Sequence, residues 1–394
     1  MPIEGIVLQM KSMNIDSVAN FPFPTPPDRH ALREAEKTLI NLGALEAKEG
    51  AKGASSHKIT ELGRSMSLFP LSPRFSKMIV AGRSNGCLPY VIAIVCALSV
   101  GDPFIREANL GDDEDELPDS EERKALSAAE IRHIRDPELR RKEELKVARK
   151  AFFESQKIHS ALGQGASDVF KMLSVVGAYE YDGAKASFCN SSFVRVKAME
   201  EIHKLRAQIS RIVSTSYHGL DAGFHPQLPP PSTTQLKVLR QLLTSAFIDQ
   251  VAIRKDLADK ASPLSYAKTV STRGVPYRAF GIDEDIFIHP SSTLFHQAPP
   301  EFVVFQEVMR TNKVWMKTVT KINPAWLPTL GRPMCTFSKP VETASTSLAT
   351  KADPTMDGST RKTIVTPRFG PGVGIELKPI LMEQRLVKGR WVFV

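Results

Sequence analysis

Three basic residues are spaced so that they would lie in one row along a helix. Lys197, Lys204 and Arg211 recur every seven residues, close to two turns of an α-helix. The segment 188–214 also carries an apolar stripe that predicts a helix, made of Val194, Ala198, Leu205, Ile209 and Ile212. The row would therefore lie on a different face from the apolar stripe.

Two arginines, Arg195 and Arg206, flank this row in the sequence. Ammonium and guanidinium groups in such an arrangement could follow the phosphates of a nucleic acid. The alternative is that the row is only the solvated side of an amphipathic helix, and the sequence leaves both interpretations open.

Patterns that would support phosphoryl transfer or metal binding are missing from the printed sequence. No glycine is followed by lysine, so the P-loop pattern is absent. The nine histidines, from His30 to His296, lack the spacing of metal ligands, and the four cysteines form no C-x-x-C pair. We predict no catalytic residue, no metal site and no disulfide framework in this chain.

Two further motifs have an ordinary structural interpretation. The run from Gly370 to Gly374 (GPGVG) does not fit G-x-G-x-x-G, so we expect a turn between strands. The acids Asp283, Glu284 and Asp285 could serve acid–base chemistry, but next to Gly281 they are more typical of a solvated hairpin turn.

Composition indicates an ordinary folded protein with a moderate basic excess. The 394 residues predict two to four domains, and 42% of them are hydrophobic. A net charge of +9 permits an anionic partner such as nucleic acid but does not identify one. The most apolar run, 87–98, is too short to span a membrane, so we expect a soluble intracellular protein without a membrane partner.

The first ninety residues predict a winged helix over 28–86. The segment 21–27 (FPFPTPP) predicts a non-helical linker, and Thr25 with Asp28 resembles a capping box that would start a helix at Pro26. Further helices are expected near Thr60 and after Ser72-Pro73, on either side of a glycine-rich wing.

An α-helical domain is expected over 87–249. Its centre is an all-apolar helix over 88–100. Inside this domain, 107–160 has the composition of an insertion: 112–122 holds eight acids, and 123–150 holds ten Lys or Arg. After Pro137 we expect a long exposed helix, which is either an arm that faces RNA or a partner, or simply a solvated helix.

After a helix over 233–249, the hydrophobic period changes to two. Short strands are expected at 251–254, 275–280, 285–289 and 302–308, which suits a small barrel of the OB type over 250–330. The remainder, 331–394, forms a C-terminal extension with a loop over 341–360 and strands at 361–365 and 391–394.

This order of domains resembles the C-terminal half of the DEAH-box ATP-dependent RNA helicases. The similarity rests on these segments: GIVLQMKSMNIDSVANFPFPTPP (5–27), ALREAEKTLINLGAL (31–45), ITELGRSMSLFPLSPRFSKMI (59–79), IVCALSVGDPFIR (94–106), FCNSSFVRVKAMEEIHKLRAQI (188–209), DIFIHPSSTLF (285–295) and EFVVFQEVMRTNKVWMKTVTKINPAWL (301–327). The resemblance implies a multi-domain α+β fold with a winged helix, an α-helical ratchet-like domain, an OB-fold β-barrel and a C-terminal extension. Residues 1–27 would be the end of the second RecA-like domain and a linker, and the RecA-like ATPase domains themselves are absent from this chain.

The insertion 107–160 and the tail 331–394 look like the nucleolar member of this family that acts on the small-subunit processome. The resemblance then implies an ATP-dependent helicase in pre-rRNA processing, located in the nucleus and nucleolus, with ATP and Mg²⁺ bound by the full-length protein and not by this chain. Its partners would be RNA (pre-rRNA, or a duplex with a single-stranded tail) and a protein activator or pre-ribosome factors. His289 and Ser291, in the IHPSS segment, are then expected to contact RNA, although His289 could instead close the barrel by hydrogen bonds.

Three alternatives remain at this stage. The chain could be a protein-docking module of the pre-ribosome with no RNA role of its own, or the C-terminal half of a splicing-type DEAH helicase. A winged-helix DNA-binding factor would need a basic recognition helix, and 60–69 offers only Arg64.

Overall fold

The computed structural model describes residues 3–47, 57–83, 86–107, 136–217, 219–220, 225, 227–258, 265–339, 360–372, 374–387 and 390–393. These residues divide between two compact units. The first comprises Met1–Lys77, Arg240–Pro290 and His296–Val394, and the second comprises Met78–Leu239 and Ser291–Phe295. The predicted acidic block 112–122 and the predicted loop 341–360 fall almost wholly outside the described residues.

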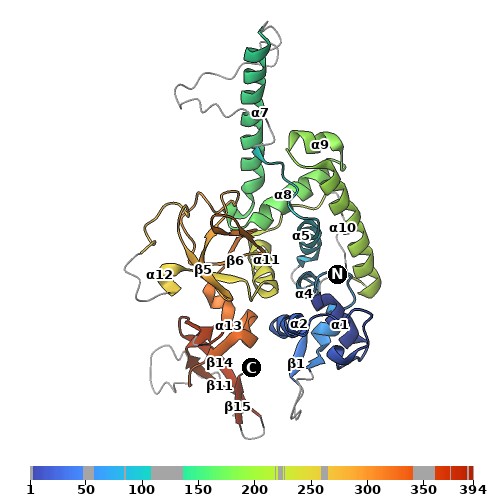
Figure 1. The fold of residues 1–394 in the computed structure, drawn as a ribbon, viewed down its shortest axis with the longest axis vertical. Helices are drawn as coiled ribbons and strands as arrows, with labels where there is room; N and C mark the ends of the chain where they lie inside the picture. Colours follow the sequence, from blue (N-terminus) through green and yellow to red (C-terminus); the bar gives the residue numbers. More distant parts are fainter. Residues whose placement is uncertain are drawn as a thin grey trace. The chain divides into compact units, whose positions relative to one another are not determined.

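The N-terminal part of the first unit is a small helical fold with a two-stranded wing (Figure 1). Its elements are α1 (Ile3–Ser12), the 3-10 turn η1 (Val18–Asn20), α2 (Arg29–Asn41), β1 (Leu45–Ala47), β2 (His57–Ile59), α3 (Glu61–Met66) and the start of α4 (Pro73–Ala81). α1 packs on α2. It carries the buried Lys11, whose ammonium group donates to the His57 carbonyl oxygen at 3.0 Å and pairs with Glu36 at 3.4 Å.

The helix starts in this part are set by local capping. Thr60 caps α3 by accepting a hydrogen bond from the Gly63 amide at 3.0 Å, as the sequence predicts. The predicted start of α2 at Pro26 is wrong, because Asp28 is the cap and accepts from the Ala31 amide at 3.0 Å. The proline pair that precedes Asp28 keeps the chain extended up to that residue.

The rest of the first unit is built on a seven-stranded sheet with the order β7-β8-β5-β4-β3-β6-β9. Neighbouring strands are antiparallel except β5 and β8, which are parallel. The bounds are β3 (Val251–Arg254), β4 (Tyr277–Ala279), β5 (Ile282–Ile288), β6 (Phe302–Val304), β7 (Glu307–Arg310), β8 (Val314–Lys317) and β9 (Thr320–Lys321). This sheet occupies the region in which the OB-type fold was expected.

The sheet differs from the sequence prediction in two places. The predicted segment 302–308 contains the whole of one strand and the start of the next, and β8 and β9 were not predicted. The acids Asp283, Glu284 and Asp285 lie inside β5, not in a turn. The turn itself is at Gly281, whose φ of 75° suits a glycine.

Shorter elements complete the first unit. They are α12 (Lys255–Ala258), η5 (Pro324–Trp326), α13 (Leu327–Leu330), η6 (Arg332–Met334), β10 (Cys335–Phe337), β11 (Thr360–Val365), β12 (Pro367–Phe369), β13 (Ile375–Glu376), β14 (Ile380–Val387) and β15 (Arg390–Phe393). The glycine-rich run at 370–374 joins the antiparallel strands β12 and β13, as predicted. A Cβ at Gly370 would meet the Phe280 ring at 2.2 Å, so only glycine allows this close approach.

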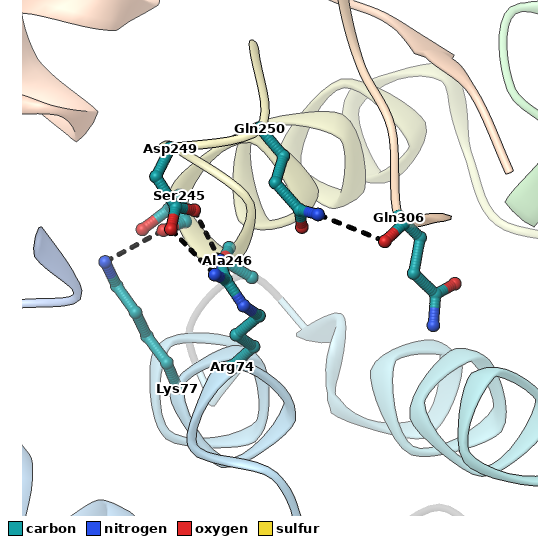
Figure 2. A network of polar contacts seen from close by, with 7 residues as sticks. All are labelled: Arg74, Lys77, Ser245, Ala246, Asp249, Gln250 and Gln306. Carbon is teal, nitrogen blue, oxygen red and sulfur yellow. Dashed lines mark hydrogen bonds and ion pairs between the residues drawn. The ribbon is translucent and has the colours of Figure 1, made fainter. Parts of the chain in front are cut away.

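A polar network joins α4 to the segment that leads into β3 (Figure 2). Arg74 holds the Asp249 carboxylate with both terminal nitrogens, at 2.5 and 2.7 Å, and also donates to the Ala246 carbonyl. Lys77 donates to the Ser245 carbonyl at 3.0 Å, and burial lowers the pKa of its ammonium group to about 8. A two-point guanidinium–carboxylate contact fixes orientation as well as distance. It therefore orients the winged part on the sheet within this unit.

The second unit is helical. It contains α5 (Leu88–Val100), α7 (Pro137–Ser160), the 3-10 turn η4 (Leu162–Gly165), α8 (Asp168–Tyr181), α9 (Ala186–Ser191) and α10 (Val196–Ser216), while α4 and α11 (Thr233–Ala246) each contribute residues to both units. α5 is buried from Leu88 to Leu98 apart from Pro89 and packs against α8 and α10, which confirms the expected apolar centre.

The single helix predicted over 188–214 is in fact two helices, α9 and α10. Between them Phe193 has a φ of 54°, and Val194 forms an antiparallel bridge with Phe104. The Arg195 amide then donates to the Pro103 carbonyl at 2.9 Å. The backbone groups here form hydrogen bonds with a segment about ninety residues away in the sequence, so they are not free to continue a helix.

Candidate nucleic-acid interface

The row predicted on one helix is present on α10 of the second unit. Lys197, Lys204 and Arg211 are all exposed, while the opposite side of α10 buries an apolar stripe of Ala198, Met199, Ile202, Ile209 and Val213. Two exposed acids, Glu200 and Glu201, lie between the first two lysines. The row is thus solvent-facing, but its positive charge is partly offset by its neighbours.

The two flanking arginines do not extend this row. Arg195 precedes α10, and its guanidinium group donates to the Asp102 carbonyl oxygen. Arg206 is 3% exposed and pairs with Glu180 on α8 at 3.2 Å. Burial lowers the pKa of Arg206 from its ordinary value, and the negative charge of Glu180 opposes that shift. Residues that are two positions apart in the sequence lie about 200° apart around the axis of a helix, so Arg206 faces away from Lys204.

Arg206 also borders a cavity of about 400 Å³ in the second unit. Most of the lining is apolar, from α5, α8 and the segment around Pro229–Pro231, and Glu180 contributes a carboxylate. The cavity is thus mainly apolar with one ion pair in its wall, and it offers no continuous track of cations.

His289 and Ser291 lie on either side of Pro290 and are assigned to different units. His289 follows β5 in the first unit, where its amide donates to the Met316 carbonyl at 3.0 Å. Its ring is nearly perpendicular to that of Trp315, at a centroid distance of 5.8 Å and an interplanar angle of 80°. Ser291 is exposed and belongs to the second unit. There the adjacent Ser292 and Thr293 bind the Asp168 carboxylate, at 2.9 Å from the Ser292 hydroxyl and 2.7 Å from the Thr293 amide.

A row of large side chains crosses three strands of the sheet, and the sequence interpretation missed it. Phe287 on β5 is paired in register with Trp315 on β8, which is paired with Met309 on β7. Directly paired residues point to the same face of a sheet. All three are half-buried, whereas Ile286, Ile288 and Met316 point to the other face and are buried.

This row, which we name the OB platform, has basic and polar groups around it. The Lys313 ammonium lies 4.8 Å from the centre of the Phe287 ring. The rings of Phe287 and Trp315 are 6.1 Å apart and tilted by 59°, and the indole nitrogen donates to the Thr311 hydroxyl at 3.0 Å. Aromatic faces beside a cation are the groups that stack on bases and hold phosphates. The alternation in IFIH and VWMK could have revealed these outward positions.

Metal sites and membrane spans are absent from the part of the chain that the structure describes. Among those residues no three His, Cys, Asp or Glu side chains cluster as a metal site would require. The printed sequence also lacks the P-loop pattern that would hold the phosphates of ATP. Within the same described ranges, no helix is both long and apolar enough to span a bilayer.

Three family descriptions match separate parts of the chain, in the expected order. "Helicase associated domain (HA2), winged-helix" matches residues 35–71, and "Helicase associated domain (HA2), ratchet-like" matches 72–172. "Oligonucleotide/oligosaccharide-binding (OB)-fold" matches 239–334 and includes the whole OB platform. The expected order of winged helix, ratchet-like domain and OB fold is therefore confirmed.

Curated relatives share this region as part of longer proteins. The chain is 39% identical to "Probable ATP-dependent RNA helicase DHR1" of Saccharomyces cerevisiae, over 100% of the chain and 32% of that protein. It is 36% identical to "Probable ATP-dependent RNA helicase DHX37" of Homo sapiens, over 86% of the chain and 27% of the relative. It is 29% identical to "ATP-dependent RNA helicase DEAH13" of Arabidopsis thaliana, over 94% of the chain and 28% of the relative. The chain thus spans about a third of the length of the curated relatives it matches.

Proposed function

We propose, from the premise that the chain belongs to the DEAH-box RNA helicases as their C-terminal part, that it binds single-stranded RNA for an ATP-dependent RNA helicase. The observation that carries this proposal is the OB platform: Phe287, Trp315 and Met309 form a half-buried row beside Lys313. Stacking of a base on an aromatic side chain contributes about 1–3 kcal/mol, whatever the base. Such a surface suits a protein that moves along RNA without reading its sequence.

Replacing Trp315 by alanine is expected to weaken binding of the full chain to a 12-nucleotide single-stranded RNA by roughly tenfold to a hundredfold, because one stacking face is lost. Fluorescence anisotropy of a labelled oligonucleotide measures the change. Trp315→Phe keeps an aromatic face and should retain most of the affinity. Phe21→Ala removes an exposed aromatic ring of the same unit and serves as the matched control. Equal affinities of Trp315→Ala and the wild type would contradict the stacking role.

We further propose that Lys197, Lys204 and Arg211 on α10 follow RNA phosphates in the second unit. The exposed Arg195 lies off this row and donates to the Asp102 carbonyl oxygen, and it would add a separate contact near the start of the helix. His289 would support the OB platform through its contact with Trp315, and the exposed Ser291 would be a minor contact. Arg206 is left out of this proposal because it is buried against Glu180.

Changing Lys197, Lys204 and Arg211 together to glutamine should lower single-strand affinity and reduce the slope of log K against log salt by roughly 2, at about 0.7 per phosphate contact. A salt series with the same oligonucleotide measures this slope. The matched control changes Arg29, Arg33 and Lys37 on α2 to glutamine, which removes the same charge from another exposed helix. If the two variants gave the same slope of log K against log salt, the row of Lys197, Lys204 and Arg211 would be only a solvated face of α10.

For the whole protein, we propose ATP-dependent RNA helicase activity, with ATP and Mg²⁺ bound outside the residues described. Hydrolysis of ATP elsewhere in the whole protein would supply the free energy for movement along RNA, and this chain would hold the RNA strand. This proposal is supported by the names of the relatives, which describe them as probable ATP-dependent RNA helicases.

The finer assignment is to pre-rRNA processing in the nucleolus, with pre-rRNA and an activating protein as partners. It is supported by the charged insertion and the C-terminal tail, which resemble the nucleolar member of the family. Crosslinking of the full-length protein to RNA in cells tests it. Recovery of pre-rRNA is expected, whereas recovery of spliceosomal RNA, or of no RNA, would favour a splicing-type helicase or a docking module.

A further inference from the structure

Helix α7 projects from the second unit, and its exposed side carries most of its positive charge. The helix runs for 24 residues, of which only Phe152, Ser155 and His159, all in its C-terminal half, are buried. Its N-terminal half extends beyond α8 and α9 of the same unit (Figure 1). Every residue from Asp136 to Lys142 is exposed.

The cations of α7 are concentrated on one face. With successive residues about 100° apart, Lys142, Lys146, Arg149, Lys150 and Lys157 fall within an arc of about 100°. All five are exposed, and the exposed ring of Phe153 lies within the same arc. We name this face the α7 stripe. The buried residues that anchor the helix, Phe152, Ser155 and His159, fall outside this arc by about 60° or more.

No acidic residue of α7 falls within the stripe, although Glu138 and Glu143 border it. Glu143 accepts from Lys146 at 2.7 Å, and Glu144 accepts from Arg140 at 3.1 Å on another face. Asp136 caps the helix, and Pro137 occupies its first turn. These local contacts stabilise the projecting half as a helix without tertiary packing, so its cations are held in a straight line.

We propose that the α7 stripe binds the sugar–phosphate backbone of double-stranded RNA. From Lys142 to Lys157 the stripe extends for about 22 Å along the helix axis. A straight line of cations suits a stiff polyanion, and RNA duplexes are recognised mainly through shape and backbone. Single-stranded RNA is instead held by stacking aromatics, and the stripe offers one ring to five cations. This surface is distinct from the OB platform and rests on the proposed function only in taking RNA as the nucleic acid.

An acidic peptide is the competing occupant. The chain itself contains such a sequence, since 112–122 holds eight acids. The two occupants differ in geometry, because a duplex presents phosphates at fixed spacing whereas a peptide can adapt. The test therefore compares both.

The test uses the full chain with Lys142, Lys146 and Lys150 changed together to glutamine, which retains helix propensity. The probes are a 20-base-pair RNA duplex, the 12-nucleotide single strand and a synthetic peptide with the sequence of residues 108–124. We expect duplex affinity to fall by roughly tenfold or more at 100 mM salt, with the salt slope reduced by roughly 2–3. Single-strand affinity should change by less than the duplex affinity, and circular dichroism should show unchanged helix content.

The α2 variant, with Arg29, Arg33 and Lys37 changed to glutamine, removes the same charge and should leave duplex binding close to wild type. Equal loss in the α2 variant, or an unchanged duplex affinity in the α7 variant, would overturn the proposal. So would selective loss of the acidic peptide, which would assign the stripe to a peptide. Because Trp315→Ala is measured on the single strand, failure of the OB platform and failure of the α7 stripe give separate results.

Discussion

Replacing Glu180 by alanine is expected to lower the free energy of unfolding of the helical unit by about 3–5 kcal/mol. Glu180 on α8 is 5% exposed, and its carboxylate is 2.9 Å from the His203 ring nitrogen and 3.2 Å from the Arg206 guanidinium. Removing it leaves the buried Arg206 without its carboxylate partner. The cost is large because a charge in a poorly solvated site has lost its compensation.

Hydrogen exchange of α8 and α10 measures this effect, and the first unit of the same chain acts as an internal reference. Glu201→Ala changes an exposed acid on α10 and should have little effect. A double replacement, Glu180→Leu with Arg206→Met, removes both charges and should recover much of the lost protection. Unchanged exchange in Glu180→Ala would show that the pair does not stabilise the unit.

Much of the helical framework could be predicted because its determinants are local. The cap at Thr60, the proline at the start of α4 and the apolar run of α5 each act within one or two turns. Strand β3 was predicted at its observed bounds, and all four of its residues are buried. The break between α9 and α10 could not be predicted, because it depends on the bridge between Val194 and Phe104.

The candidate interface was predictable only in part. Spacing alone predicted the row on α10, and the same spacing, applied strictly, places Arg206 on the opposite side of the helix. The OB platform depends on the parallel pairing of β5 with β8, which sets Phe287 beside Trp315. Those residues are 28 positions apart in the sequence, and no local pattern fixes their register.

Acidification is expected to destabilise the base of the arm that carries the α7 stripe. His159, near the C-terminal end of α7, is 5% exposed and its ring nitrogen lies 3.3 Å from the Ser174 hydroxyl on α8. Burial, reinforced by the positive charge of Lys171, lowers the pKa of His159 to about 4. The folded protein therefore holds this imidazole neutral at pH values where the unfolded chain has already bound a proton.

The direction in which stability changes with pH follows from how many protons the folded and unfolded states bind. Between pH 6.5, the ordinary pKa of histidine, and about pH 4, the unfolded state binds more protons at this site. The stability that the neutral imidazole contributes is fully present above pH 6.5 and is lost as the pH falls through this window. At about 1.36 kcal/mol for each unit of pKa, the loss approaches roughly 3 kcal/mol.

Urea unfolding of the wild type and of His159→Gln at pH 7 and pH 4.5 measures this loss, because other titrating groups cancel in the difference between the two proteins. Between pH 7 and pH 4.5, the free energy of unfolding of the wild type should fall by about 2–3 kcal/mol more than that of His159→Gln. The variant His30→Gln, at an exposed position of α2, serves as the control for the substitution itself. Since His159 anchors α7 to α8, hydrogen exchange at pH 4.5 should increase first where these two helices meet, and loss of protection that begins elsewhere would show that another group controls acid unfolding.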